Sequence, residues 1–247
     1  MNGTYACIAD RTAGVRMVNV ANPGQAAEVG SYSCLNGLTW EVPVAGGYAY
    51  VVVAGGPLEV LNVAAPARPF QMGSYPTPLR DVAVAGHYAY VAAEEEGLRI
   101  LDISTPTNIR EVGVCDTPGF ASGVAVAGGY AYVGDGEQGL LVIDVSNPSR
   151  PMRIGRCDTS GFADRVAVSG ACAYVCAISG GLRIINVSDP AHPFQVGYYA
   201  TTGRASDVAV VGNRAYLADS EGFLRILDVT HPDNPSQMAQ YRLGGAA

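Results

Sequence analysis

Short runs of apolar and β-branched residues recur along the chain, separated by Gly, Pro, Asn and Asp. One run, Tyr-Ala-Tyr-Val in its fullest form, occurs at 48–51, 88–91 and 130–133, with weaker copies at 5–8, 172–175 and 214–217. The third residues of these copies, 7, 50, 90, 132, 174 and 216, are spaced by 43, 40, 42, 42 and 42 positions. Short runs bounded by turn residues are typical of β-strands, and none has the spacing of an amphipathic helix. The pattern predicts an all-β repeat protein.

Three further runs complete each repeat. Leu-Arg-Ile-Leu-Asp-Ile at 98–103 recurs at 140–145, 182–187 and 224–229, with degenerate copies starting at Val15 and Leu58. A run like Val-Gly-Ser-Tyr at 29–32 ends every unit, and a run like Asp-Val-Ala-Val at 81–84 precedes the Tyr-Ala-Tyr-Val run. Four short strands in a unit of this length predict one blade of a β-propeller. In chain order we name the four strands a, b, c and d. Strand a is the run at 81–84 and its copies, strand b is the Tyr-Ala-Tyr-Val run, strand c is the run at 98–103 and its copies, and strand d is the run that ends each unit.

The strand c runs carry a family resemblance. Leu-Arg-Ile-Leu-Asp-Ile and Leu-Leu-Val-Ile-Asp-Val resemble the LVIVD repeat of bacterial and archaeal β-propeller proteins. The resemblance covers nearly the whole chain and recurs six times. It implies a propeller fold. It also implies a surface or exported protein, in a family of mostly unassigned function whose members often carry other modules.

The strand count suggests how the propeller closes. Strands b, c and d occur six times and strand a five times; Met1 matches Val210, and Ala247 matches Ala205. We expect a six-bladed β-propeller of four-stranded antiparallel blades, a single domain over 1–247, closed between its N- and C-terminal segments, because closure removes exposed sheet edges. The approximate units, the first incomplete at its N-terminus, are 1–37, 38–78, 79–120, 121–162, 163–204 and 205–247. A fragment of a longer chain that has lost one inner strand is the alternative.

Composition excludes several classes of protein. All 15 basic residues are Arg, and the net charge is −7, so the chain lacks the basic surface that nucleic acid requires. No apolar run approaches the roughly 20 residues that span a bilayer, so we expect no membrane insertion. The segment 1–5 lacks the features of a signal peptide. This favours a cytoplasmic location, whereas the family resemblance favours the cell surface, and the location stays open.

One face of the predicted propeller concentrates the non-repeating polar and aromatic residues. Because strand direction alternates, the d–a and b–c connections share one face, and the a–b and c–d connections share the other. Arg can bind a carboxylate or phosphate with two hydrogen bonds, and aromatic rings supply stacking surface, which suits a peptide or small polar ligand. The candidate ligand-binding residues are Trp40, Glu41, Arg80, Asp81, Phe120, Phe162, Asp164, Arg165, Arg204 and Asp207. The alternative is that these charged side chains pair with one another and only form the hydrated rim of this face, without binding a ligand.

Two classes of function fit this face. The first hypothesis is a non-catalytic binding or scaffold propeller, a monomer without a cofactor, that binds a peptide, glycan or protein partner there. The alternative is a hydrolase, lyase or isomerase, which would require Arg and carboxylate side chains to converge on one point with a shifted pKa among them. A third interpretation, a structural module of a longer surface protein, predicts no pocket.

Metal and histidine chemistry have little support. Clustered carboxylates at Glu94–Glu96 suit a hard cation, but their spacing matches no EF-hand or nonapeptide calcium repeat, so a solvated loop is expected and no metal site is predicted. His87, His192 and His231 lie in turns of the opposite face, without a Ser or Cys arranged as a nucleophile. We interpret them as surface residues.

The six cysteines are expected to be free and mostly buried. Cys115 and Cys157 hold the same position in neighbouring repeats, so a whole blade separates them, beyond the reach of a disulfide. Cys172 and Cys176 straddle one strand and lie roughly 13 Å apart in extended backbone. Cys34 lies near the candidate face, where a reactive thiol remains an open alternative.

An Asp or Asn recurs near the end of strand c in every repeat. Because such side chains bond the backbone two residues on, the pattern predicts caps on the following Pro-containing turn rather than site residues. The six positions are Asn19, Asn62, Asp102, Asp144, Asn186 and Asp228.

Overall fold

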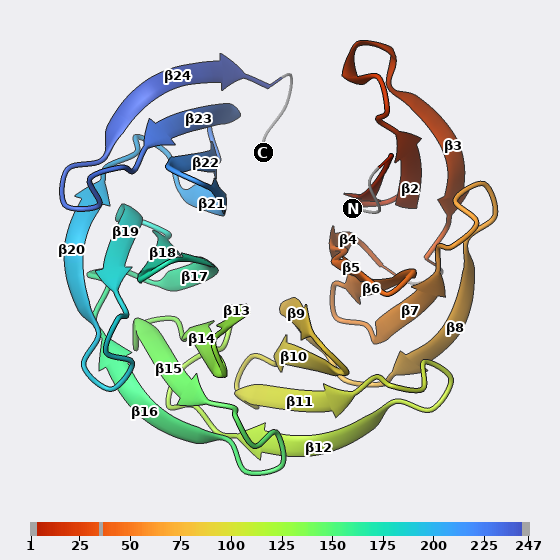
Figure 1. Ribbon diagram of the computed structural model, residues 1–247, viewed down its shortest axis with the longest axis horizontal. Coiled ribbons are helices and arrows are strands. Elements are labelled where there is room, and N and C mark those ends of the chain that lie inside the picture. The colour runs from red at the N-terminus through yellow and green to blue at the C-terminus, as the bar shows by residue number, and fades with distance from the viewer. Residues whose placement is uncertain (1–3, 35–36, 244–247) are drawn as a thin grey trace. The chain divides into compact units, whose positions relative to one another are not determined.

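The computed structural model describes residues 4–34 and 37–243, and almost all of its regular structure is β-strand. One short 3₁₀ helix, Pro23–Gln25, is the only helical segment in those residues. The strands form six successive antiparallel sheets, labelled in Figure 1. The chain divides into two compact units, residues 1–94 with 99–113 and residues 95–98 with 114–247.

The first unit holds blades 1 and 2 and most of blade 3. Blade 1 is a three-stranded sheet of β1 (Tyr5–Asp10), β2 (Gly14–Asn19) and β3 (Ala27–Tyr32). Blade 2 consists of β4 (Thr39–Glu41), β5 (Val44–Ala45), β6 (Tyr48–Val53), β7 (Leu58–Asn62) and β8 (Phe70–Tyr75). Blade 3 consists of β9 (Asp81–Ala85), β10 (Tyr88–Ala92), β11 (Leu98–Asp102) and β12 (Arg110–Cys115).

The second unit holds blades 4, 5 and 6, each with four strands. Blade 4 consists of β13 (Gly123–Ala127), β14 (Tyr130–Gly134), β15 (Leu140–Asp144) and β16 (Met152–Cys157). Blade 5 consists of β17 (Ala163–Ser169), β18 (Cys172–Ala177), β19 (Gly181–Asn186) and β20 (Phe194–Tyr199). Blade 6 consists of β21 (Ala205–Val211), β22 (Arg214–Asp219), β23 (Phe223–Asp228) and β24 (Ser236–Arg242).

The structure confirms the all-β six-bladed propeller and the order of strands a to d in each blade. Blade 2 differs from the prediction in one detail, because its strand a is split into β4 and β5. Pro43 lies at the break and has no N–H to donate to a ladder, although its carbonyl still accepts from the Tyr50 amide at 2.9 Å. The predicted completion of blade 1 involves residues 244–247, which lie outside the described residues, so it stays a prediction.

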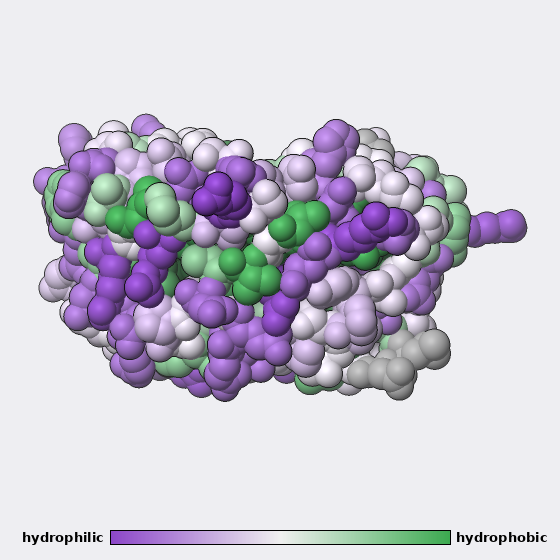
Figure 2. Space-filling model, turned by 90° about the horizontal axis from the view of Figure 1, so that it is seen from below, coloured by the Kyte–Doolittle hydropathy of each residue, from purple (hydrophilic) through white to green (hydrophobic). Residues whose placement is uncertain are grey.

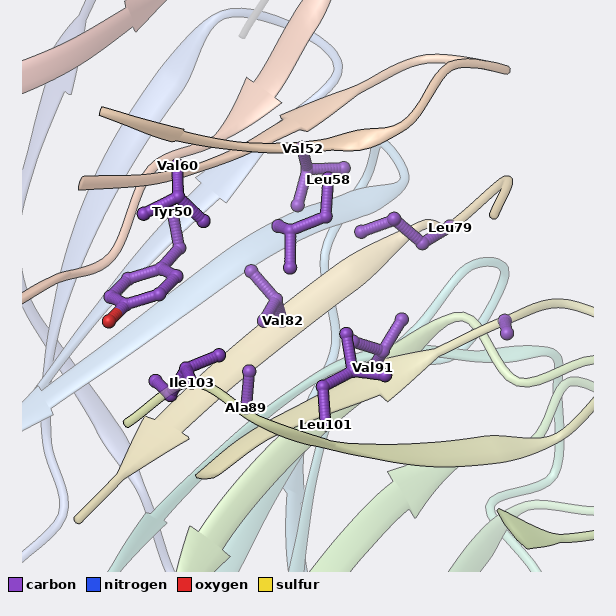
Figure 3. Packing of buried hydrophobic residues seen from close by; sticks show 11 residues of the cluster. Tyr50, Val52, Leu58, Val60, Leu79, Val82, Ala89, Val91, Leu101 and Ile103 are labelled. Carbon is purple, nitrogen blue, oxygen red and sulfur yellow. The ribbon is translucent and has the colours of Figure 1, made fainter. Parts of the chain in front are cut away.

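The core of the first unit lies between neighbouring blades. Alternate residues of β6 point to opposite faces, as the two-residue period of a strand requires. Val51 and Val53 pack with Val15 and Met17 of blade 1. On the other face, Tyr50 and Val52, with Leu58 and Val60, pack against blade 3 through Leu79, Val82, Val91 and Leu101 (Figure 3). Blade 2 is therefore apolar on both faces.

The second unit repeats this arrangement. Leu140 and Val142 of blade 4 pack with Val166 and Ile185 of blade 5. A second set of side chains joins blades 5 and 6, namely Tyr174, Cys176, Leu182, Ile184, Val208, Leu217 and Leu227. Burying one such Leu or Ile side chain stabilises the fold by about 1.5–3 kcal/mol, so these interblade clusters hold the sheets together.

The outer strands leave some apolar side chains exposed. Phe70, Met152 and Phe194 each begin strand d of their blade and are 52%, 60% and 56% exposed. Figure 2 shows one side of the molecule, where hydrophilic residues predominate and hydrophobic residues form separate, small patches. Isolated exposed apolar residues of this kind are ordinary on a protein surface.

The predicted turn caps are present in all six repeats. Each Asp or Asn accepts a hydrogen bond from the backbone amide two residues on, at 2.8–3.0 Å. The bonded pairs are Asn19–Ala21, Asn62–Ala64, Asp102–Ser104, Asp144–Ser146, Asn186–Ser188 and Asp228–Thr230. These residues are structural, as the repetition indicated.

A bulge recurs where strand d pairs with strand c. In blade 4, Ile143 pairs with Arg153 and Leu141 pairs with Arg156, so strand β16 holds one residue more than β15 over this stretch. Paired residues on adjacent strands face the same side of a sheet, and the extra residue therefore puts Arg153 and Arg156 on one side. The same register shift occurs in blades 1, 2, 5 and 6.

Candidate functional site

The b–c connection of blade 6 is built around a buried carboxylate. Asp219, at the end of β22, is fully buried and accepts from the amides of Glu221 and Phe223 at 3.1 and 3.0 Å. Arg225 on β23 donates to its other oxygen through Nε and Nη2, both at 2.8 Å. Gln237 and Gln240 of β24 accept from Arg225 Nη1 at 3.2 and 3.1 Å. This network joins the b–c connection to strands c and d.

The equivalent residue of blade 4, Asp135, holds a different loop. It is also fully buried, and it accepts from the Thr117 hydroxyl at 2.6 Å and the Gly119 amide at 2.9 Å. Burial raises the pKa of Asp135, although these hydrogen bonds work in the opposite direction. Both oxygens are thus committed to the d–a connection that precedes Phe120. Asp135 and Asp219 shape the connections from within and do not line their surface.

The strand c position that Arg225 occupies in blade 6 holds different residues in the other blades. The residue at this position pairs with a residue of strand b, and the pairs are Ile8–Arg16, Val51–Glu59, Val133–Leu141, Val175–Arg183 and Leu217–Arg225. In blade 3 the corresponding residue is Arg99. Three of the Arg residues have acidic partners: Arg16 bonds Asp10 and Glu28, Arg99 bonds Glu111, and Arg225 bonds Asp219. In both Asp10–Arg16 and Asp219–Arg225 the Asp precedes the Arg by six residues. This spacing is visible in the sequence, but the sequence alone does not show that the two side chains bond.

In the first unit, two predicted site residues meet. The Arg80 guanidinium lies over the Trp40 ring, 4.7 Å from its centroid, which is the geometry of a cation–π contact. Both side chains are partly exposed. Asp81 is buried and accepts from the Val82 amide at 2.8 Å. Glu41 ends the short strand β4, beside the break at Pro43. Trp40 and Arg80 therefore contact each other and are both partly exposed.

In the second unit, Phe120 and Phe162 form an aromatic pair. Their ring centroids lie 6.1 Å apart, with planes tilted by 49°. Gly136 of the blade 4 b–c connection bridges to Ala163 through two backbone hydrogen bonds, and a Cβ at Gly136 would lie 3.0 Å from the Phe162 ring. A glycine is favoured there, because its φ is +58° and a Cβ would press on the ring. Two d–a connections thus present one aromatic surface.

The charged candidates of the second unit gather around the inner end of blade 5. Cys176 on β18 is fully buried, and burial raises the pKa of its thiol, with Asp207 and Asp164 adding to the effect and Arg165 opposing it. Each of these three charged groups therefore lies near the Cys176 thiol. Asp207 also accepts from the Val208 amide at 2.8 Å, as Asp81 does in blade 3. Arg204 is exposed, and its backbone amide donates to the Ser220 hydroxyl at 2.9 Å.

The cysteines are free thiols, as predicted, and four of them are buried. Cys34 is half-buried beside Glu59, and burial, reinforced by the Glu59 charge, raises the pKa of its thiol to about 12. Burial likewise raises the pKa of Glu59, and its Oε2 has no hydrogen-bond partner among the described residues. A thiol with so high a pKa is almost entirely protonated at neutral pH, which argues against a reactive nucleophile at Cys34.

The remaining sequence candidates lie in exposed turns. His87, His192 and His231 are exposed, and His192 Nδ1 lies 2.9 Å from Asp189 Oδ2. Glu95 and Glu96 are exposed in their loop. Within residues 4–34 and 37–243, no group of three or more His, Cys, Asp or Glu side chains is arranged to hold a metal ion. Among the same residues there is no helix long and apolar enough to cross a membrane.

The sequence matches the model of the LVIVD repeat in six consecutive segments. They are residues 1–34, 36–77, 79–117, 118–159, 160–201 and 202–242, so the match extends over nearly the whole chain. Segments two to six each contain strands a to d of one blade, and the first contains the three strands of blade 1. No curated protein matches the sequence.

Solved structures share the fold at low sequence identity. A functionally unknown protein from Desulfotomaculum acetoxidans DSM 771 has a TM-score of 0.80 and 11% identity, over 98% of this chain and 80% of the other. The computationally designed Ika8 protein has a TM-score of 0.71 and 9% identity, over 100% and 74%. BamB from Moraxella catarrhalis has a TM-score of 0.62 and 14% identity, over 99% and 75%. At these identities the likeness is one of fold alone.

Proposed function

The chain belongs to the LVIVD-repeat family, and we propose that it is a non-catalytic binding protein, a single propeller domain that takes a peptide or protein partner on the d–a and b–c connections of its second unit. The predicted site residues Phe120 and Phe162 would contact the partner. Aromatic and Arg side chains are the types that contribute most to protein interfaces, because they bury large areas and form directed contacts.

The hydrogen bonds of Asp135 carry this proposal. They fix the connection at 117–119 immediately before Phe120, so the aromatic pair is held in place before any partner arrives. A surface ordered in advance loses less conformational entropy on binding, and more of the contact energy then appears as affinity. The buried carboxylates supply the rigidity, while the residues that differ between blades supply the contacts.

Catalysis receives less support from the same carboxylates. Asp135 has the raised pKa that a general acid needs, but its side chain is fully buried and both oxygens accept hydrogen bonds from its own chain. Asp219 is equally buried and is held by Arg225. A catalytic carboxylate must reach substrate, and these two are oriented away from it.

Selection of peptides from a displayed random library on the immobilised full chain tests the proposal. Titration calorimetry of the selected peptides would compare the wild-type protein with the Phe120→Ala and Phe162→Ala variants. We expect each substitution to weaken binding at least tenfold, because truncating a central aromatic anchor costs about 2 kcal/mol or more.

The Phe194→Ala variant is the matched control. Phe194 is an exposed Phe at the start of strand d, outside the proposed surface, so its loss should leave the affinity unchanged. Peptides that bind all four proteins equally would contradict the proposed surface. Failure to enrich any peptide would contradict a peptide-binding role.

A further inference from the structure

A second surface, on the outer strand of blade 4, inverts a charge pattern found in other blades. In blades 1, 3 and 6, a strand c Arg bonds acceptors on strand d: Arg16 bonds Glu28, Arg99 bonds Glu111, and Arg225 bonds Gln237 and Gln240. The recurrent bulge makes this possible, because it places both strand d positions on the side of the strand c residue.

In blade 4 the Arg residues are on strand d, and an apolar residue occupies the strand c position. The strand c residue is Leu141, which is fully buried, and the two strand d positions are Arg153 and Arg156, which are both exposed. Arg156 is oriented by its Nε, which donates to the Gln138 carbonyl at 2.8 Å. Where blades 1, 3 and 6 place strand d acceptors beside a strand c cation, blade 4 presents two guanidinium groups on one side of the sheet.

These two Arg residues have no internal counter-charge. Within residues 4–34 and 37–243, neither Arg153 nor Arg156 forms an ion pair with a carboxylate. Asp135 is near enough for both to lower its pKa slightly, but it is fully buried and its oxygens are bonded to Thr117 and Gly119. In a chain of net charge −7, two adjacent Arg residues without an acid are conspicuous.

The same residues line an open groove of about 500 Å³. Its polar lining residues are Arg153, Arg156 and Gln138, and its apolar lining residues are Pro118, Ile154 and Ala191. Pro118 and Gln138 belong to d–a and b–c connections of blades 3 and 4, and Ala191 belongs to the c–d connection of blade 5, so the groove follows the outer strand of blade 4. A groove that combines guanidinium groups with apolar wall suits a ligand that has both acidic and aliphatic parts.

We propose that this groove binds an acidic peptide segment of a partner, with carboxylate side chains on Arg153 and Arg156 and aliphatic portions against Pro118, Ile154 and Ala191. The inference rests on the proposed function only in taking a peptide as the ligand, since the surface and its residues are different. The net charge of −7 disfavours acidic segments on most of the remaining surface.

Fluorescence anisotropy with a labelled Glu-rich peptide, and with the same peptide carrying Gln at every Glu, tests the groove. The wild-type chain should bind the Glu peptide and bind the Gln peptide about threefold to tenfold more weakly, because two exposed charge pairs each contribute modestly. The R153A/R156A variant should lose about the same factor for the Glu peptide, and its affinity should no longer fall as the salt concentration rises.

The R68A/R214A variant is the matched control, because it removes the same charge from two exposed residues outside the groove. It should bind as the wild type does, and circular dichroism melting checks that both variants are folded. Equal affinities for the Glu and Gln peptides, or an undiminished affinity in R153A/R156A, would overturn the proposal. So would inorganic phosphate binding the groove more tightly than the peptide.

Each of the two proposals can be overturned without the other. If library peptides depend on Phe120 and Phe162 while the Glu peptide does not bind, only the groove is overturned. If the Glu peptide binds through Arg153 and Arg156 while the library gives no binder that depends on the Phe pair, the groove stands and the proposed surface of the aromatic pair is overturned.

Discussion

Blades 5 and 6 have the same strand order and the same Arg on strand c, yet the two Arg residues have different environments. Arg225 of blade 6 lies against Asp219, Gln237 and Gln240. Arg183 of blade 5 has Ala177 where blade 6 has Asp219, and Tyr198 where it has Gln240. Its guanidinium lies 5.3 Å from the Tyr198 ring centroid, and its Nε is buried without a hydrogen-bond partner among the described residues.

This difference shows that the repeat determines the position of a side chain but not its interactions. The backbone register is the same, because Arg183 pairs with Val175 and Arg225 with Leu217. Both guanidinium groups lie over a ring, Arg225 at 5.2 Å from the Phe223 centroid, and the residue six positions earlier decides whether the guanidinium also forms a buried ion pair. A repeat protein can therefore change a local network by one substitution in a b–c connection, without altering the blade.

The largest effect should come from Arg225→Ala, compared with Arg183→Ala. Removing Arg225 leaves Asp219 fully buried without its cation, and breaking one partner of a buried pair costs about 3–5 kcal/mol. Removing Arg183 takes away a ring contact, which is worth about 1 kcal/mol or less at a partly exposed site. Urea unfolding followed by fluorescence measures both free energies of unfolding.

The Arg225→Lys variant controls for the loss of side-chain volume. It keeps a positive charge but cannot donate twice to Asp219, so its stability should fall between those of the wild type and Arg225→Ala. Equal losses of stability in Arg225→Ala and Arg183→Ala would remove the distinction between the two blades.

The fold was predictable from the sequence because every level of the pattern agrees. The four runs, their spacing and the turn residues at their ends specify the strands, and the strands specify the blade. The break in strand a of blade 2 follows from Pro43, which the sequence displays, although the strand was expected to run through it. The six turn caps were predicted because their bonds are local, two residues apart.

The candidate sites were less predictable, because they depend on contacts between distant residues. The sequence placed Phe120 and Phe162 on one face but could not show that their rings meet. It gave no indication that Asp135 and Asp219 are buried beneath that face. Arg153 and Arg156 were overlooked, because an ordinary strand would put residues three apart on opposite sides and only the bulge brings them together. A comparison of strand d in all repeats shows Arg153 where the other repeats have Glu or Gln, whereas the position of Arg156 holds Ser, Val, Tyr or Gln elsewhere.

An intermediate effect is expected from Ala177→Asp, which gives blade 5 the acid of blade 6. Gly161 and Gly180, which have no side chains, lie beside Ala177. The new carboxylate would accept from the unpartnered Nε of Arg183, and we expect a gain of about 1 kcal/mol in the free energy of unfolding. The same urea titration measures it.

The Ala177→Asn variant has nearly the same volume without the charge, so it should gain less. The double variant Ala177→Asp/Arg183→Ala should be less stable than either single variant, because its buried carboxylate has no cation. A loss of stability in Ala177→Asp itself would show that the b–c connection of blade 5 cannot accommodate the blade 6 network.

The smallest effect concerns the turn after strand c, where blade 6 has Asp228 and blade 5 has Asn186. Hydrogen bonds from the Thr230 hydroxyl and amide lower the pKa of Asp228, whereas Asn186 makes the same backbone bond without titrating. A carboxyl whose folded pKa lies below its unfolded value of about 3.9 stabilises the fold above that pH, and the contribution is lost as the pH falls through the folded pKa. Acidification from pH 7 to pH 3 should therefore destabilise Asp228→Asn less than the wild type, and Asn186→Asp more. Urea midpoints at the two pH values measure the difference, and an identical pH dependence in all three proteins would show that the two turns are energetically equivalent.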